Sequence, residues 1–217
     1  MQRLMDILAA FILIVLLLPL LVSIAIAIRI TSPGPVLFIQ ARIGMKGRVF
    51  RMFKFRTMYQ NTEKMGTGLY SFENDPRITQ LGHMLRRTSL DELPQLFNVL
   101  GGSMSLVGPR PPVTYELGPW ESYTPEMRKR FEVKPGITGL AQVSGRNELN
   151  WDEKIAFDNA YVELIARQGV WADLVILLRT LGVVLVRRDS VERQAPLREK
   201  LGSVAARART AGQAERS

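Results

Sequence analysis

Residues 89–100 read SLDELPQLFNVL, and residues 107–111 read VGPRP. The first stretch places an Asp-Glu pair at the start of an apolar helical pattern. The second bends the chain with glycine and proline and leaves Arg110 fixed between two prolines. Together they predict a helix whose first turn faces a stiff loop. Such an arrangement suits a metal ion and a phosphate held beside a carboxylate.

The pair Asp91-Glu92 has a structural and a chemical interpretation, and the pattern alone does not choose between them. Acidic residues in a first turn complement the helix dipole, and Ser89 with Glu92 matches a capping box. Pro94 favours a slightly later start, with Asp91 as the cap. In the chemical interpretation, an ionised carboxylate receives Mg²⁺ beside substrate phosphates or attacks phosphorus as a nucleophile. Arg110 would then bind the same phosphate through two hydrogen bonds from its guanidinium group.

Composition restricts the class of protein. The 217 residues suffice for one domain with a small appendage, and the net charge of +9 indicates anionic partners such as lipid headgroups, nucleotides or nucleic acid. Cysteine is absent, which excludes disulfides and thiolate metal sites. The lone histidine, His83, is interpreted as a surface residue rather than as a base or a ligand.

The N-terminal segment carries no charge between Asp6 and Arg29 and is long enough to cross a bilayer. A cleaved signal peptide is disfavoured by the length of the run and by Asp6. A spanning helix and a re-entrant hairpin broken at Pro19 both remain, because each arm of the hairpin is about half a bilayer core, roughly 14–18 Å. On these grounds alone, spanning is slightly favoured.

Basic residues follow the apolar run, and no acidic residue occurs between Asp6 and Glu63. This asymmetry predicts that the rest of the chain lies on the cytoplasmic side of the membrane. The same cations are suited to anionic headgroups. The residues concerned are Arg29, Arg42, Lys46, Arg48, Arg51, Lys54 and Arg56.

The body of the chain contains both strand-like alternation and helix-like spacing of apolar residues. Residues 36–43 and 49–58 are predicted as a β-hairpin joined by residues 44–47. In its second strand Lys54 and Arg56 share a face, which is either solvated or turned towards phosphate. A helix is expected over residues 78–87.

Two further helices are expected near the C-terminal end. Asn150 and Glu153 predict a capping box for a helix that ends before Gly169. Residues 171–186 predict an apolar helix that either lies on the membrane surface or packs in the core. The fold class is therefore α+β, mainly helical with a small hairpin. The segments are a membrane segment over 1–30, a cytosol-facing domain over 31–190 and a flexible basic tail over 191–217.

Several motifs in one order resemble the bacterial sugar transferase family, the monotopic polyprenyl-phosphate phosphoglycosyl transferases. They are residues 33–36 (PGPV), 54–58 (KFRTM), 89–100, 106–111 and 134–147 (KPGITGLAQVSGRN), together with Asp158 and Tyr161. The resemblance implies a monotopic protein of the bacterial inner membrane, with a re-entrant helix, interfacial amphipathic helices and a cytoplasmic catalytic domain. It also implies transfer of a sugar-1-phosphate from a UDP-sugar to polyprenyl phosphate with release of UMP.

The resemblance implies roles for individual residues. Asp91 would be the nucleophile that takes the phospho-sugar covalently and would hold Mg²⁺, with Glu92 as its essential neighbour. The implied substrate-binding residues are Lys54, Arg56, Arg110, Arg146 and Asp158. Two rivals stay open: a non-enzymatic membrane-anchored basic protein, and a glycosyltransferase that releases UDP. Nucleic acid is not an expected partner, because no recognition signature is present.

Overall fold

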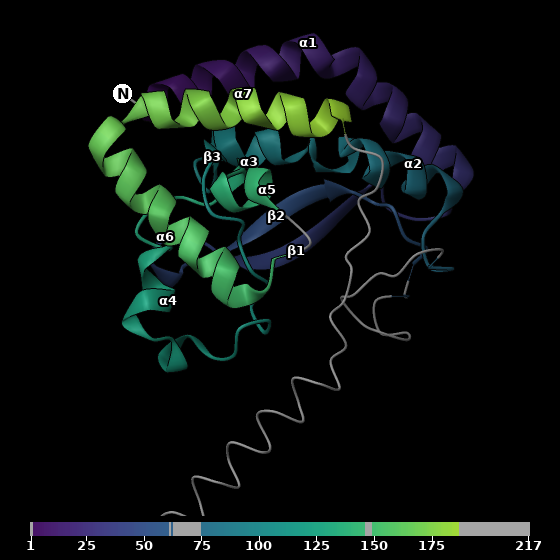
Figure 1. Ribbon diagram of the computed structural model, residues 1–217. Coiled ribbons are helices and arrows are strands. Elements are labelled where there is room, and N and C mark those ends of the chain that lie inside the picture. The colour runs from purple at the N-terminus through teal and green to yellow at the C-terminus, as the bar shows by residue number, and fades with distance from the viewer. Residues whose placement is uncertain (1, 61, 63–74, 146–148, 187–217) are drawn as a thin grey trace, which may run out of the picture.

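The computed structural model describes residues 2–60, 62, 75–145 and 149–186. Helices predominate, and two small sheets accompany them (Figure 1). The predicted mainly helical α+β class with a small hairpin is confirmed, whereas the predicted tail at 191–217 lies outside the described residues. The elements are α1 (Gln2–Thr31), β1 (Leu37–Ile43), η1 (Met45–Gly47), β2 (Val49–Phe55), α2 (Gln80–Thr88), η2 (Leu90–Glu92), α3 (Gln95–Gly101), β3 (Ser105–Val107), η3 (Trp120–Ser122), α4 (Pro125–Lys129), β4 (Gly136–Thr138), α5 (Leu140–Ser144), α6 (Trp151–Gln168) and α7 (Val170–Val186).

The predicted hairpin is confirmed as the antiparallel pair β1–β2. Its register runs from Leu37 opposite Phe55 to Ile43 opposite Val49. Strand β2 ends at Phe55 rather than at the predicted Met58. The difference changes which way Arg56 faces, because strict alternation of side chains holds only within a strand.

The second sheet, β3–β4, was not expected from the sequence. Its strands run parallel, with Ser105 opposite Gly136 and Val107 opposite Thr138. Each strand has three residues, which is too short for a period-two pattern to be visible. The sheet matters because the loop that carries Arg110 begins directly after β3.

The helices expected near the C-terminal end are confirmed. The capping box of α6 is present: Glu153 N donates to Asn150 Oδ1 at 3.0 Å, and Asn150 N donates to Glu153 Oε2 at 2.7 Å. Helix α7 buries Ala172 and Ile176 and exposes an apolar face that includes Trp171, which is 73% exposed. Helix α7 thus packs on the domain through one face, and contact of its exposed apolar face with a membrane stays a prediction.

Helix α1 is continuous through Pro19, where the re-entrant hairpin implied by the family resemblance was expected to break. Figure 1 shows the helix bent near its middle rather than folded into two antiparallel arms. Ser23 Oγ donates to Pro19 O at 2.8 Å, one turn back. By length and composition, α1 is the one helix in the described part of the chain that qualifies as a membrane-crossing candidate. The re-entrant topology itself stays a prediction.

Both halves of α1 pack on the rest of the protein. In the first half Ala10 is fully buried against Met52, Val99 and Met104. In the second half Ile24 and Ile28 pack with Phe55 and Leu85, a second core cluster. Burial of Ile24 and Ile28 contributes about 1.5–3 kcal/mol each relative to exposure. The N-terminal helix is therefore part of the core.

Polar contacts fix the beginning of α1. Arg3 donates to Val99 O at 2.5 Å and to Leu100 O at 2.8 Å, which satisfies carbonyls at the C-terminal end of α3. The buried Asp6 carboxylate accepts from Ser105 Oγ at 2.8 Å and from Leu106 N at 3.1 Å. These contacts tie the start of the apolar helix to α3 and β3.

Three glycines allow the backbone to close up where β4 meets the end of β3. A Cβ added at Gly136 would collide with Gly108 N and Thr138 O, and one at Gly139 would collide with Gly108 O. These are backbone atoms, so no side-chain rotation relieves the clash. The close approach requires glycine at these positions.

Replacement of Gly136 by alanine is therefore expected to destabilise the fold strongly, by about 3 kcal/mol or more, because overpacking against backbone atoms cannot relax easily. Gly182→Ala is the matched control, since a Cβ at Gly182 meets nothing within 4 Å. The control should be neutral or slightly stabilising, since alanine is favoured over glycine in a helix. Thermal unfolding in detergent or nanodiscs measures both. Equal midpoints for the two variants would contradict the packing described here.

Candidate active site

Asp91 and Glu92 lie between two helices, in the 3₁₀ turn η2. Helix α2 ends at Thr88, and the residue that caps its C-terminus, Ser89, has a left-handed backbone (φ 58°). Pro94 then stands at the start of α3, and no side chain caps that helix. The expected capping box of Ser89 with Glu92 is therefore wrong, as is Asp91 as the helix cap. The pair is nevertheless largely buried, at 9% and 8% exposure.

The side chain of Asn98 fixes α3 against the hairpin. Its Oδ1 accepts from Phe53 N at 2.9 Å, and its Nδ2 donates to Arg51 O at 2.7 Å. The side-chain amide of Asn98 thus makes the two backbone hydrogen bonds that a further strand beside β2 would otherwise make. This contact sets the distance between η2 and the following residue of β2, Lys54.

Glu92 is the acceptor at the centre of the site. Its Oε1 accepts from Lys54 Nζ at 2.9 Å and from Arg110 Nη2 at 3.0 Å. Burial lowers the pKa of Lys54, while the charge of Glu92 acts in the opposite direction. Since Lys54 and Arg110 come from a strand and a loop, Glu92 joins three separate segments. The structure therefore brings these two predicted binding residues together.

Asp91 has a different environment from its neighbour. Among the residues that the structure describes, none donates a hydrogen bond to its carboxylate. Burial raises the pKa of Asp91, and Glu92 adds to that effect against the attraction of Lys54. A buried carboxylate without a donor is costly when ionised. A cation bound at Asp91 would compensate for that cost.

The donor set fits Mg²⁺ only if a substrate supplies further ligands. The described residues contain no group of three or more His, Cys, Asp or Glu side chains close enough to hold a metal ion. Glu92 is already occupied by two cations, which leaves Asp91 as the protein ligand. Mg²⁺ is commonly held by one or two carboxylates together with substrate phosphates. The site is thus compatible with a metal that arrives with, or bridges to, a phosphorylated ligand.

The loop of residues 109–112 is held by its carbonyl groups. Three of its four residues are prolines, which have no N–H to donate. Each carbonyl nevertheless has a donor, and the four donors come from three parts of the chain. The pairs are Gly136 N to Pro109 O at 3.0 Å, Arg130 Nη2 to Arg110 O at 2.7 Å, Arg42 Nη1 to Pro111 O at 2.8 Å and Ile43 N to Pro112 O at 3.0 Å.

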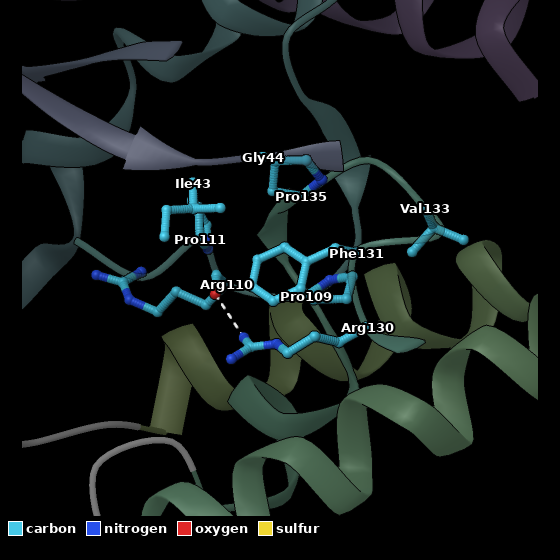
Figure 2. A pocket seen from close by; sticks show the side chains of 9 residues that line it. All are labelled: Ile43, Gly44, Pro109, Arg110, Pro111, Arg130, Phe131, Val133 and Pro135. Carbon is cyan, nitrogen blue, oxygen red and sulfur yellow. Dashed lines mark hydrogen bonds between the residues drawn. The ribbon is translucent and has the colours of Figure 1, made fainter. Parts of the chain in front are cut away.

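A small cleft lies behind this loop, lined by residues that include Gly44, Pro109, Arg130 and Phe131 (Figure 2). Its free volume is about 10 Å³, enough for about one water molecule. Figure 2 shows the Arg130 guanidinium directed at the carbonyl of Arg110, while the Arg110 side chain points away from it. The loop therefore presents its arginine on one face and is anchored from the other.

Arg42 and Arg86 are site residues that the sequence did not single out. Burial and the charge of Arg110 lower the pKa of Arg42 to about 10. Arg86 lies near enough to Asp91 to lower its pKa and donates to Thr57 Oγ1 at 2.9 Å. Arg42 was counted only among the basic residues that follow the apolar run. Two further cations thus accompany Lys54 and Arg110.

The other predicted substrate-binding residues lie elsewhere. Arg56 donates to Ser32 O, Ser32 Oγ and Pro33 O at 2.5–2.8 Å, so it fixes the turn after α1. Asp158 pairs with Arg130 at 2.7 Å in the interior. Arg146 lies outside the described residues. A binding role for Arg56, Asp158 or Arg146 stays a prediction.

Comparison with known proteins gives a family match. The model of a family described as bacterial sugar transferase matches residues 1–187. The chain is 40% identical over 201 residues to UDP-galactose-lipid carrier transferase of Erwinia amylovora, covering 86% of this chain and 41% of that protein. It is 46% identical over 164 residues to galactosyl transferase CpsE of Streptococcus agalactiae, covering 70% and 35%.

A third relative has a more explicit name. The UDP-glucose:undecaprenyl-phosphate glucose-1-phosphate transferase of Escherichia coli K12 is 42% identical over 186 residues, which cover 83% of this chain and 39% of that protein. The chain spans about two fifths of the length of the curated relatives it matches.

The pH dependence of stability tests the environment of Asp158. Burial raises its pKa to about 6, from an ordinary 3.8, in spite of the attraction of Arg130. The folded protein therefore binds this proton more tightly than the unfolded chain does. Between about pH 4 and pH 7, rising pH removes up to about 3 kcal/mol of stability through this group.

The expected result is that the wild type loses stability relative to Asp158→Asn as the pH rises through this window. Denaturant unfolding of both proteins at pH 4.5, 6 and 7.5 measures the difference, and the other carboxylates cancel because both proteins contain them. Parallel pH profiles would show that the Asp158 carboxyl is not perturbed.

Proposed function

This chain belongs to the bacterial sugar transferase family, and we propose that it transfers a sugar-1-phosphate from a UDP-sugar to polyprenyl phosphate, with release of UMP. Relatives are named as undecaprenyl-phosphate galactose phosphotransferase and as UDP-glucose:undecaprenyl-phosphate glucose-1-phosphate transferase. Those names supply the class of donor and acceptor. The site contributes four cations around two carboxylates, which suits a diphosphate donor and a phosphate acceptor.

The observation that carries the proposal is the contrast between the two carboxylates. Glu92 is held by Lys54 and Arg110, whereas none of the described residues donates a hydrogen bond to the Asp91 carboxylate. Glu92 therefore organises the cations, and Asp91 remains available for bond formation. Asp91 lies beside that organised charge, at the place where a phosphoryl group would bind.

In the proposed reaction an oxygen of Asp91 attacks the phosphorus that carries the sugar. The bond from this phosphorus to the oxygen that bridges the two phosphates breaks, and UMP leaves with that oxygen. An oxygen of polyprenyl phosphate then attacks the same phosphorus and releases the Asp91 carboxylate. The bond between the sugar and its oxygen is never broken, so the anomeric configuration is retained.

Charge neutralisation is the main contribution of the protein. Phosphoryl transfer depends chiefly on positioning and on stabilising charge in the transition state. Arg110 and Lys54 would bind phosphate oxygens, with Glu92 keeping both cations in place. Bound Mg²⁺, held by Asp91 and the diphosphate, would supply further neutralisation of the phosphate oxygens.

The proposal includes a monotopic arrangement at the cytoplasmic face of the bacterial inner membrane, with anionic lipids beside the basic residues. It is supported by the packing of α1, because Arg3 near one end and Ile28 near the other contact the same charged domain. A helix that crossed the bilayer would separate these two ends by about 30 Å of hydrocarbon. The exposed apolar residues of α1 and α7 lie on elements at the same side of the molecule (Figure 1).

The assay for the reaction uses the full chain in nanodiscs with undecaprenyl phosphate, Mg²⁺ and a panel of UDP-sugars. At least one sugar is expected to give UMP. Asp91→Asn should lower the rate about 1,000-fold or more, because the variant lacks the nucleophile. Asp152→Asn is the control, since Asp152 is an exposed acid in the first turn of α6.

Omission of the acceptor sharpens this test. One equivalent of UMP per protein should then appear, and mass spectrometry should find a sugar-phosphate on the peptide that contains Asp91. Release of UDP instead of UMP would identify an ordinary glycosyltransferase. An active Asp91→Asn protein would exclude the covalent route.

The topology has its own test. An epitope tag before Gln2 and a second tag after the last residue should both be digested by protease only when the cytoplasmic face of sealed vesicles is accessible. This is expected because both halves of α1 pack on one domain. Protection of the N-terminal tag under those conditions would show that α1 spans the membrane.

A further inference from the structure

Two opposite charges are buried behind the loop that carries Arg110. Arg130 follows α4, and Asp158 lies in the middle of α6. Arg130 Nη2 is 2.7 Å from Asp158 Oδ2, and their side chains are only 1% and 2% exposed. The same Nη2 atom donates to the carbonyl oxygen of Arg110 at 2.7 Å (Figure 2).

Stability alone does not account for this pair. Removing two charges from water costs several kcal/mol per ion, and apolar residues of similar volume are often as stabilising or more so. The compensation here is incomplete, because Arg130 Nε and Nη1 and Asp158 Oδ1 have no hydrogen-bond partner among the described residues. Burying this ion pair costs free energy, and its arginine donates to one backbone carbonyl, that of Arg110. This contact indicates that the pair serves to hold that carbonyl in place.

We propose that Arg130 and Asp158 are positioning residues, which place the Arg110 guanidinium for phosphate binding by holding the Arg110 backbone. The inference rests on the proposed function for the identity of the ligand, a diphosphate or phosphate ester. Neither residue would touch the substrate. Asp158 orients Arg130, Arg130 holds Arg110 O, and Arg110 binds the phosphate.

The loop needs such an anchor because its guanidinium is repelled by its neighbours. The charge of Arg110 lowers the pKa of both Arg42 and Lys54, so the three cations oppose one another around Glu92. Glu92 offsets part of this repulsion through its ion pair with Arg110 at 3.0 Å, but the Arg110 side chain is 39% exposed and comes from a loop, so the backbone anchor adds a second constraint. Three of the four loop residues are prolines without an N–H, so backbone anchoring of the loop relies mainly on its carbonyls.

The geometry of Arg130 suits a fixed anchor. Its guanidinium carbon lies 5.3 Å from the centroid of the Trp151 ring and 5.4 Å from that of Phe131. The aromatic rings fix the plane of the guanidinium, and Asp158 fixes its rotation within that plane. A lysine would lack the planar group that contacts the two rings.

A double-mutant cycle tests whether the pair acts through Arg110. Asp158→Asn and Arg130→Lys are each made in the wild type and in Arg110→Ala. We expect each to lower kcat/KM for the UDP-sugar about 10-fold or more in the wild type and less than 2-fold in Arg110→Ala. Glu163→Gln is the matched control on α6, because it removes only the exposed pair with Lys129 and should have no effect in either background.

A binding measurement separates this inference from the proposed reaction. Isothermal titration with UDP in the presence of Mg²⁺ should show weaker binding for Asp158→Asn in the wild-type background only, in line with the kinetic cycle. If no UDP-sugar is turned over, the proposed function fails, yet the binding cycle still tests the positioning role.

Two outcomes would overturn the inference. Equal losses in both backgrounds would mean that the pair acts on something other than Arg110. Failure of both Asp158→Asn and Arg130→Lys to fold, with Glu163→Gln folded, would make the pair a purely structural element. Thermal unfolding of every variant distinguishes this second outcome from the first.

Discussion

One oxygen atom, Glu92 Oε1, is the contact on which the site depends. It accepts from Lys54 and Arg110, which are 38 and 18 residues away in the chain. A single acceptor thereby joins the β2 strand, the η2 turn and the proline loop. Without it, Lys54 and Arg110 would repel one another in a largely buried space. Glu92 acts as a fixed counter-ion, and the carboxylate of its neighbour Asp91 accepts no hydrogen bond from the described residues, which is why we propose Asp91 as the group that reacts with the ligand.

The backbone supports this arrangement at short range. Asn98 holds α3 to β2, Gly136 and Gly139 bring β4 against the residues before Arg110, and Ser89 turns the chain between α2 and η2. A position with a left-handed backbone at a non-glycine residue is costly and tends to occur where geometry is functionally constrained. Ser89 lies two residues before Asp91. The local strain is thus located next to the carboxylate that we propose as the nucleophile.

Sequence reasoning predicted the elements with strong local signals and missed those made by distant contacts. The hairpin and α6 follow from alternation and from the Asn150 capping box. The sheet of β3 and β4 arises from segments about 30 residues apart, which no periodicity reveals. Arg56 was expected beside Lys54 on the strand face, but β2 ends one residue earlier and Arg56 turns to the end of α1.

The same limit applies to charged residues in the site. Arg110 was identifiable because flanking prolines fix its backbone. Arg42 and Arg130 were not, since an arginine in a basic chain is usually solvated and only tertiary packing shows which ones are buried. The pair Asp91-Glu92 was found from its position before α3, although the turn that carries it differs from the helix start that was expected.

The packing of α1 has a practical consequence for handling the protein. Ala10 belongs to the same core cluster as Val99, and Ile28 to the same cluster as Leu85. Deleting the apolar N-terminal segment would therefore expose the core. A water-soluble truncation is thus the wrong starting material for crystallography or inhibitor screening. Solubilisation must therefore keep α1 packed in both clusters. A detergent that displaces α1 is expected to unfold the rest of the domain as well.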